Sequence, residues 1–345
     1  MNKLKVPSLL TTAHNMRYFT GFTGEGFAFV GGIKNVIFTD SRYTEQAKIQ
    51  TGAEVIEYSH ADMWNVVSGW LKDNGIRDVG CELESMSAAD YLTLRRLGLD
   101  VNDISAEAER RRMVKSPEET ESVRRACEIA DITFEHMKTV LRCGISEREA
   151  AAELEYFMKL SGAESTSFDT IMASGENGSM PHAIVSDRRI AAGDMVTMDF
   201  GCKINGYCSD ITRTVAIESI AIEQKRVYNI VYQAQTEALS AVKPGAVCRE
   251  VDMLARRIIA DAGFGKYFGH GLGHSLGLLI HETPRFNPTD ETQLEPGMII
   301  TVEPGIYLPA GFGVRIEDTV LVTDTGFERL TKSDKQLIIL GGKHQ

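Results

Sequence analysis

The stretch MDFGCKINGYCSDITRT, residues 198–214, places one aspartate on either side of an Asn-Gly pair at 205–206. Asn-Gly between two extended segments is a strong signal for a two-residue hairpin turn. With that pair at the turn, Asp210 lies opposite Gly201 and therefore two residues from Asp199 on the same face. The two aspartates become diagonal cross-strand neighbours, with backbones roughly 7–8 Å apart. Their carboxylates can converge on a shared cation, and without one they would repel each other.

Two further predicted strands bring carboxylates of their own. Residues 298–302 are nearly all apolar and are followed by Glu303. Residues 314–322 alternate between apolar and polar side chains, with Arg315 and Glu317 on the polar face. A strand that carries Glu317 on a face of its own needs a partner for that charge.

Three histidines, His270, His274 and His281, crowd into the segment HGLGHSLGLLIHE at 270–282. Its glycines argue against a regular helix and for a close approach of the backbone to another group. No Lys-Ser or Lys-Thr pair follows the glycines, so the segment is not a phosphate-binding loop. The H-E-x-x-H pattern is absent as well, because His281-Glu282 is followed by Thr-Pro-Arg.

Taken singly, each of these residues has an ordinary explanation as an exposed, salt-bridged or buried structural group. Together they indicate a metal site, because the four carboxylates carry a formal charge of about −4, which two divalent cations would neutralise. Oxygen-rich ligation with one imidazole suits manganese, iron, cobalt or zinc better than a structural tetrahedral zinc site. The six cysteines form no C-x-x-C pair, so they predict neither a zinc ribbon nor a disulfide scaffold.

The composition limits the class of protein. The chain has 345 residues, 43% hydrophobic and 25% charged, with a net charge of −11. These values are ordinary for a soluble globular protein, and the acidic balance argues against nucleic acid or an anionic membrane as a partner. The N-terminus has no apolar core for a signal peptide, and the longest stretch without acidic, lysine or arginine residues, 267–281, is too short and polar to cross a bilayer. We expect a cytoplasmic protein.

The length predicts two domains, at roughly 150 residues per domain. Strand-like and helix-like segments alternate in the first part of the chain, with short strands at Phe27–Val30 and Val36–Thr39, which predicts an α/β domain over 1–112. A capping box at Ser116 then starts a long amphipathic helix. In the remainder, 113–345, tight turns join strands too closely for an all-parallel sheet.

At the aspartates, glutamates and histidines described above, the chain resembles the pita-bread metallopeptidases, specifically the Xaa-Pro aminopeptidase and prolidase branch. The resemblance implies an α/β N-terminal domain of the creatinase/prolidase kind. It implies that the second domain is an α+β pita-bread catalytic domain with a curved, mainly antiparallel sheet. The ordered set of motifs is highly specific, and the matching segments cover nearly the whole chain: NMRYFTGFTG (15–24), FTDSRYTEQA (38–47), MVKSPEE (113–119), SFDTIMASGENGSMPHA (167–183), MDFG (198–201), SDITRT (209–214), HGLGHSLGLLIHE (270–282), TVEPGIY (301–307) and VRIEDTV (314–320).

The resemblance also implies two divalent metal ions per chain, with manganese expected first and cobalt, zinc or iron as alternatives. The implied ligands are Asp199, Asp210, His274, Glu303 and Glu317. Asp210 and Glu317 would bridge the two ions, Asp199 would hold one of them, and His274 and Glu303 would hold the other.

Catalytic and substrate-binding roles follow from the same resemblance. Glu303 would move a proton from water toward the leaving imino nitrogen, and His281 would stabilise the tetrahedral oxyanion. His182 and His270 complete the expected catalytic set and would position the substrate around its proline. Arg315 would orient the substrate or support the metal-bound carboxylates.

The function implied is hydrolysis of the peptide bond before proline. We expect an Xaa-Pro aminopeptidase, with an Xaa-Pro dipeptidase (prolidase) as the alternative, because no residue decides whether a peptide tail after the proline is accepted. A non-catalytic, peptidase-like binding scaffold is a remote alternative, since such proteins typically lose ligands and none is lost here. The family commonly forms dimers whose N-terminal domain shapes access to the site, so a homodimer acting on proline-containing peptides is expected.

Overall fold

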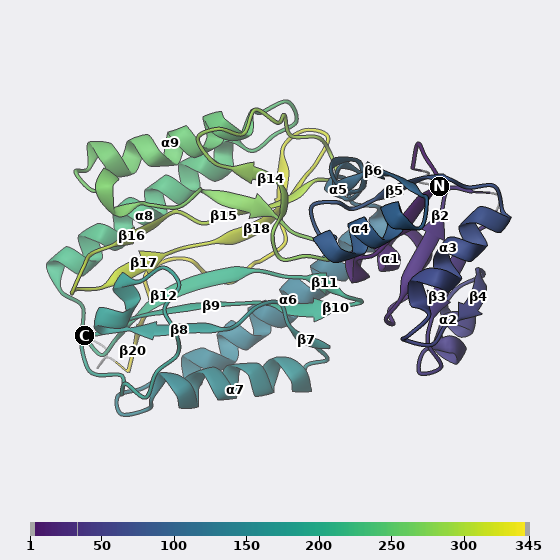
Figure 1. Cartoon of the computed structure of the whole chain (residues 1–345). Coiled ribbons are helices and arrows are strands. Elements are labelled where there is room, and N and C mark those ends of the chain that lie inside the picture. The colour runs from purple at the N-terminus through teal and green to yellow at the C-terminus, as the bar shows by residue number, and fades with distance from the viewer. Residues whose placement is uncertain (1–3, 33, 342–345) are drawn as a thin grey trace. The chain divides into compact units, whose positions relative to one another are not determined.

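The computed structural model describes residues 4–32 and 34–341 (Figure 1). Contacts within the chain divide it into two compact units, Met1–Arg112 and Met113–Gln345. Every helix in the described part of the chain is too short or too polar to span a lipid bilayer.

The first unit is built on a mixed six-stranded sheet with the strand order β4-β3-β2-β1-β5-β6. The predicted strands Phe27–Val30 and Val36–Thr39 are confirmed as the antiparallel neighbours β2 and β3. Helices alternate with the strands along the chain, so the α/β prediction for this unit is confirmed. The other strands are β1 (Ser8–Leu10), β4 (Glu54–Glu57), β5 (Asp78–Cys81) and β6 (Asp100–Asp103), and the helices are α1 (Ala13–Thr20), α2 (Thr44–Gln50), α3 (Met63–Asp73), α4 (Ala88–Arg96) and α5 (Ser105–Met113).

The second unit has two helix pairs with strands between them (Figure 1). The capping box predicted at Ser116 is present: its hydroxyl accepts from the Glu119 amide, and its own amide donates to the Glu119 carboxylate. A second capping box, between Ser146 and Glu149, opens the next helix. The helices are α6 (Pro117–Val140), α7 (Glu147–Leu160), α8 (Ile222–Ala241) and α9 (Cys248–Asp261), with short 3₁₀ turns η1 (Gly175–Ser179) and η2 (Gly265–Tyr267).

The strands of this unit form two main sheets, ordered β20-β12-β9-β8 and β14-β13-β15-β18-β19, and two small ones, β11-β10-β7 and β16-β17. All their pairings are antiparallel except β12 with β20, as expected for a mainly antiparallel α+β domain. The strands are β7 (Ser165–Thr166), β8 (Ile171–Ser174), β9 (Met195–Phe200), β10 (Cys202–Ile204), β11 (Tyr207–Cys208), β12 (Ile211–Ile217), β13 (Gly273–Ser275), β14 (Glu282–Phe286), β15 (Ile299–Val302), β16 (Gly305–Tyr307), β17 (Gly313–Arg315), β18 (Asp318–Val322), β19 (Phe327–Arg329) and β20 (Ile339–Leu340).

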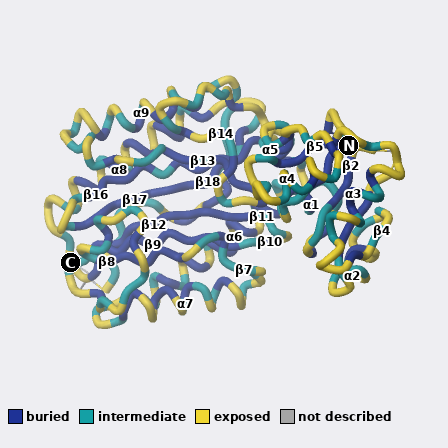
Figure 2. The backbone as a smooth tube through the Cα atoms, in the orientation of Figure 1, coloured by how far each residue is buried: buried dark blue, intermediate teal, exposed yellow. Residues whose placement is uncertain are grey.

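Each helix pair packs its apolar face on a different part of the strand layer. Residues of α6 and α7 form one buried cluster with residues of β9 and β12, and residues of α8 and α9 form another with residues of β15 to β18. The strands are the most continuously buried segments of this unit (Figure 2). Polar groups carried on their inner faces are therefore shielded from bulk water.

The hairpin predicted around Asn205-Gly206 is present with the expected register. Both turn residues have positive φ, 48° and 72°, as a tight hairpin turn of this kind requires. The same offset pairs Lys203 with Cys208 near the turn and Thr212 with Asp199 beyond it. At Gly201, an added Cβ would overlap the carbonyl oxygen of Ser209, so the strands approach closely just where Asp210 faces this glycine.

The predicted strand 314–322 and the extended segment that follows the Asn205-Gly206 turn are both interrupted. The segment 207–215 leaves the ladder at Ser209 and Asp210, between β11 and β12, and the segment 314–322 does so at Ile316 and Glu317, between β17 and β18. The second break has a visible cause, because the amide of Glu317 donates to the carbonyl of Thr212 in another sheet (3.1 Å). Both breaks release an acidic residue from a regular strand position.

Candidate metal centre

Three acidic side chains from three different strand ends converge inside the second unit. Asp199 ends β9, Asp210 precedes β12 and Glu317 precedes β18. One oxygen from each lies within 4.8 Å of the others, and the three residues are only 9%, 4% and 1% exposed. The diagonal placement of the two aspartates predicted from the hairpin is thus present, and Glu317 joins them.

The described residues offer no hydrogen-bond partner to one oxygen of each of these carboxylates, Asp199 Oδ1, Asp210 Oδ1 and Glu317 Oε1. Buried carboxylate oxygens without donors are costly and rare. The second oxygens of two of the groups are held: Arg315 Nη2 donates to Asp199 Oδ2, and Thr212 Oγ1 donates to Glu317 Oε2 (2.8 Å). The free oxygens are therefore available to bind a cation.

Burial and mutual repulsion disfavour the ionised forms of these groups. Desolvation raises the pKa of Asp210 well above its usual value, and the neighbouring Glu317 and Asp199 charges raise it further. The pKa of Glu317 is raised in the same way by desolvation and by Glu303 and Asp199. Desolvation also raises the pKa of Asp199, against the lowering effect of Arg315. Only an added positive charge would keep all of them ionised at neutral pH.

His274 and Glu303 extend the cluster. His274 Nε2 lies 3.3 Å from Glu303 Oε1 and 3.6 Å from Asp210 Oδ2. The other ring nitrogen, Nδ1, lies 3.2 Å from the carbonyl oxygen of Ser275. A carbonyl can only accept, so Nδ1 donates its proton there, and Nε2 is the ring nitrogen that faces the carboxylates.

The residues present fit a divalent metal centre. Carboxylates and one imidazole nitrogen lie close together, and three of the carboxylates each have one oxygen without a donor among the described residues. Manganese, iron, cobalt and zinc accept such a donor set. Without a cation the same arrangement would be a concentration of buried negative charge. The five residues named from the sequence as ligands are thus brought together.

Tyr307 belongs to the site, and the sequence analysis missed it. Its hydroxyl accepts from Arg315 Nη1 (2.7 Å) and lies 2.9 Å from His270 Nε2. His270 Nδ1 faces the carbonyl of Gly271 (2.8 Å), so Nδ1 is the donor and Nε2 accepts from Tyr307. Desolvation raises the pKa of Tyr307 to about 12, which keeps the hydroxyl protonated. In the sequence, the only sign that Tyr307 belongs to the site is its position at the end of the motif TVEPGIY.

Arg315 connects the parts of the site. Besides Tyr307 and Asp199, its guanidinium donates to Thr212 Oγ1 (3.1 Å) and to the carbonyl of Pro181 (3.3 Å). The last contact fixes the backbone immediately before His182. Arg315 is 3% exposed, so this positive charge is buried beside the acidic cluster.

The remaining two predicted residues are exposed and lie at the edge of the cluster. The rings of His281 and His274 meet edge to face, with centroids 4.5 Å apart. Desolvation, followed by the charges of His274 and Arg285, lowers the pKa of His281 to about 4, so its imidazole is neutral at neutral pH. His182 is near enough to act electrostatically on both His270 and His281. All the residues predicted for the site therefore gather in one region of the second unit.

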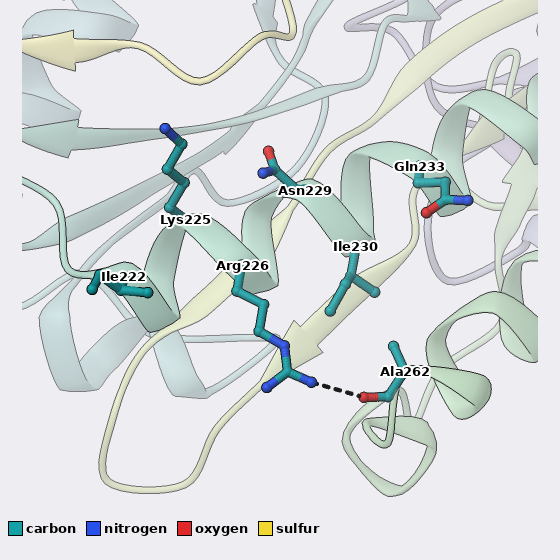
Figure 3. A pocket seen from close by; sticks show the side chains of 7 residues that line it. All are labelled: Ile222, Lys225, Arg226, Asn229, Ile230, Gln233 and Ala262. Atoms are coloured by element: carbon teal, nitrogen blue, oxygen red, sulfur yellow. Dashed lines mark hydrogen bonds between the residues drawn. The ribbon is translucent and has the colours of Figure 1, made fainter.

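A separate surface hollow lies between α8 and the end of α9 (Figure 3). It is lined by Ile222, Lys225, Arg226, Asn229, Ile230, Gln233 and Ala262, and includes none of the predicted site residues. Arg226 bridges its two walls by donating to the carbonyl of Ala262 (3.5 Å). The acidic cluster, rather than this hollow, carries the chemistry expected from the sequence.

Both units of the chain match families of known proteins. Residues 121–324 match the model of metallopeptidase family M24, and residues 7–114 match the creatinase/prolidase N-terminal domain. The Xaa-Pro dipeptidase of Pyrococcus furiosus is 40% identical over 94% of this chain and 92% of its own length. Among solved structures, the Xaa-Pro dipeptidase from Bacillus anthracis superposes with a TM-score of 0.93 at 42% identity, covering 96% of this chain and 94% of that one. The X-Pro aminopeptidase from Thermotoga maritima gives a TM-score of 0.90 at 36% identity, covering 96% and 97%. The chain therefore belongs to metallopeptidase family M24, in the pita-bread Xaa-Pro peptidase branch, and is a peptidase.

Proposed function

We propose that this protein is an Xaa-Pro dipeptidase, a prolidase that hydrolyses the bond before the proline of Xaa-Pro dipeptides. The observation that carries the proposal is the buried carboxylate cluster with its unpartnered oxygens. The two relatives named Xaa-Pro dipeptidase, from Pyrococcus furiosus and Bacillus anthracis, support the choice of substrate. They favour the dipeptidase over the aminopeptidase that we expected first from the sequence.

The proposed metal ligands are Asp199, Asp210, His274, Glu303 and Glu317. Asp210 and Glu317 each have one free, buried oxygen, as the bridging role implied by the family resemblance requires. We propose two divalent ions per chain, with manganese first and cobalt, zinc or iron as alternatives. When bound, such cations bring the pKa of a water molecule toward about 7 and polarise the substrate carbonyl.

The chain's own residues would then handle the protons and the charge. Glu303 accepts the proton of the attacking water and transfers it to the imino nitrogen that leaves. His281, neutral and at the edge of the cluster, donates a hydrogen bond to the oxyanion that forms on the carbonyl oxygen. Arg315 holds Asp199 in place and, through the carbonyl of Pro181, fixes the segment that carries His182.

His270 has a more restricted role than a general hydrogen-bond donor. Both of its ring nitrogens are already engaged, by Gly271 and by Tyr307. We therefore propose that His270 contacts the proline through its ring face and C–H groups. His182, on an exposed segment without regular structure, is left to make the polar contact with the substrate.

An Xaa-Pro aminopeptidase is the second candidate, favoured by the likeness to the Thermotoga maritima structure titled X-Pro aminopeptidase. The test compares cleavage of Xaa-Pro dipeptides with that of Xaa-Pro-Yaa tripeptides by metal-stripped protein resupplied with manganese. Cleavage confined to dipeptides supports the dipeptidase. Rapid tripeptide cleavage would favour the aminopeptidase, and cleavage of neither despite bound metal would exclude proline specificity.

We further propose that the protein forms a homodimer and that its N-terminal domain, 1–112, serves dimerisation and access to the site. The family that the chain resembles commonly forms dimers. Sedimentation equilibrium at micromolar protein should give twice the chain mass, and a monomer at that concentration would contradict the proposal.

A further inference from the structure

Lys115 and Glu282 form an ion pair that is almost completely buried beside the metal centre. Lys115 Nζ donates to Glu282 Oε2 (3.2 Å) and to Ser275 Oγ (3.0 Å), and the two charged side chains are 1% and 2% exposed. Ser275 directly follows the proposed ligand His274, and Glu282 directly follows His281. None of the roles assigned above uses this pair.

The pair closes the base of the loop that carries His281. Ser275 at the end of β13 is the cross-strand partner of Glu282 at the start of β14, so Lys115 bridges the two residues where the loop 276–281 begins and ends. Inside the loop, Glu282 Oε1 accepts from the Leu279 amide (3.3 Å). A Cβ at Gly277 would come within 2.7 Å of Glu282 Oε2, so the carboxylate fills the interior of the loop.

His274 and His281 depend on this pair to different degrees. His274 lies within β13, and its amide also donates to Thr301 Oγ1 (3.1 Å). His281 lies outside the strands, one residue before Glu282. The loop is tied elsewhere by the Cys208 amide, which donates to the Gly277 carbonyl (2.8 Å), but no such backbone contact to another strand is found at His281 among the described residues.

We propose that the Lys115–Glu282 ion pair is a positioning element that fixes the loop 276–281 and thereby holds His281 against the reacting carbonyl. The proposal rests on the proposed function for the role of His281. Two buried charges are expensive, and apolar residues of similar volume often give equal stability. The contribution of this pair would then be to fix the geometry of the loop, as precisely placed catalytic groups require.

The first test is a kinetic cycle on the manganese-loaded full-length protein with Lys115→Met, His281→Ala and the double variant. Removing one donor to an oxyanion lowers kcat by about 100-fold or more, and mispositioning it should lower kcat by about tenfold or more. We expect Lys115→Met to lower kcat with KM changed less than about twofold and the metal content unchanged. In the His281→Ala background the same substitution should have no further effect. An equal loss in both backgrounds would overturn the proposal.

Glu282→Gln provides a second variant, because it keeps the shape of the side chain and removes its charge. Glu282→Gln should lower kcat as Lys115→Met does. Lys115→Arg, which keeps the positive charge, should lower kcat less than Lys115→Met. Leu154→Ala is the control for general destabilisation, since Leu154 is a buried residue of α7. If Leu154→Ala lowers kcat as much as Glu282→Gln at equal loss of stability, the pair is only structural.

The second readout does not depend on hydrolysis. The ring Cε1–H resonance of His281, identified by its loss in His281→Ala, should shift in both Lys115→Met and Glu282→Gln in metal-free and Zn²⁺-loaded protein. The resonance of His136, which stacks on Phe157 with centroids 4.0 Å apart, should stay in place. An unmoved His281 resonance would refute the positioning role even if the wild type cleaves Xaa-Pro. If the wild type cleaves no Xaa-Pro peptide, the proposed function fails, while the resonance still decides the positioning role.

Discussion

At the scale of single residues, Asp210 is the metal-centre residue whose ionised carboxylate is hardest to accommodate without a cation. Its carboxylate is buried, has one oxygen without a donor among the described residues, and its pKa is raised by burial and by three neighbouring carboxylates. These features make Asp210 unfavourable in the metal-free protein and favourable once a cation is bound. Its substitution should therefore act in opposite directions on the two forms.

We predict that Asp210→Asn raises the melting temperature of the metal-free protein and prevents occupancy of both metal sites. The amide removes one of several repelling charges but cannot bridge two cations. Since residues that only support metal ligands cost 10–100-fold when changed, kcat/KM should fall by more than about 100-fold. Elemental analysis, calorimetry and Xaa-Pro hydrolysis measure the three effects.

The matched control is Asp187→Asn, because Asp187 is exposed and pairs with Arg148 at the surface. It removes the same charge and should leave metal content and activity unchanged. An Asp210→Asn protein with full stoichiometric metal would refute the bridging assignment.

His281 should behave differently from the ligands. We predict that His281→Ala keeps both metals and lowers kcat by about 100-fold or more, with little change in KM, because its hydrogen bond strengthens only as the oxyanion forms. Metal analysis and steady-state kinetics on the same preparation test this. Loss of metal from the variant would instead assign His281 to assembly of the site.

At the scale of elements, the hairpin from β9 to β12 sets the distance between the two aspartates. Gly201 permits this approach, since an added Cβ would overlap the Ser209 carbonyl. We predict that Gly201→Ala lowers the free energy of unfolding by about 1–3 kcal/mol and weakens metal binding by shifting Asp210. Chemical denaturation and metal titration measure the two effects.

Gly326→Ala is the corresponding control, because an added Cβ at Gly326 would meet nothing within 4 Å. Its stability and metal affinity should stay close to those of the wild type. If Gly201→Ala is equally harmless, the hairpin does not define the spacing of the aspartates.

Local sequence signals predicted the elements that local chemistry determines. The Asn205-Gly206 turn fixed the hairpin register, and the capping box at Ser116 located the start of α6. The break at Glu317 could not be predicted, because it depends on a hydrogen bond between residues of different sheets, from the Glu317 amide to the Thr212 carbonyl.

Side-chain partners that are remote in sequence were likewise missed. Tyr307 becomes part of the site only because β16 and β17 pair and bring Arg315 beside it. Lys115 reaches Glu282 across 167 positions of the chain. Nothing in the spacing of these residues indicates contact, whereas the ligand types and their order were available from the motifs.

At the scale of the whole molecule, metal binding and stability should be coupled. A cation that binds the folded protein with free metal at about 100 times its Kd stabilises by about 2.7 kcal/mol. For a domain of this size we predict that manganese raises the melting temperature of the metal-stripped protein by about 5–10 °C. Calorimetry with and without manganese measures it, and an unchanged melting temperature would mean that the acidic cluster does not hold the ion.

The central claim is that a divalent metal held by this acidic cluster is required to hydrolyse Xaa-Pro dipeptides. The most direct test titrates manganese into metal-stripped protein while bound metal and Xaa-Pro hydrolysis are followed in the same samples. We predict no hydrolysis without metal, and activity that rises with occupancy and levels off at two ions per chain. Hydrolysis by the metal-free protein, or full occupancy without hydrolysis of any Xaa-Pro substrate, would contradict the account.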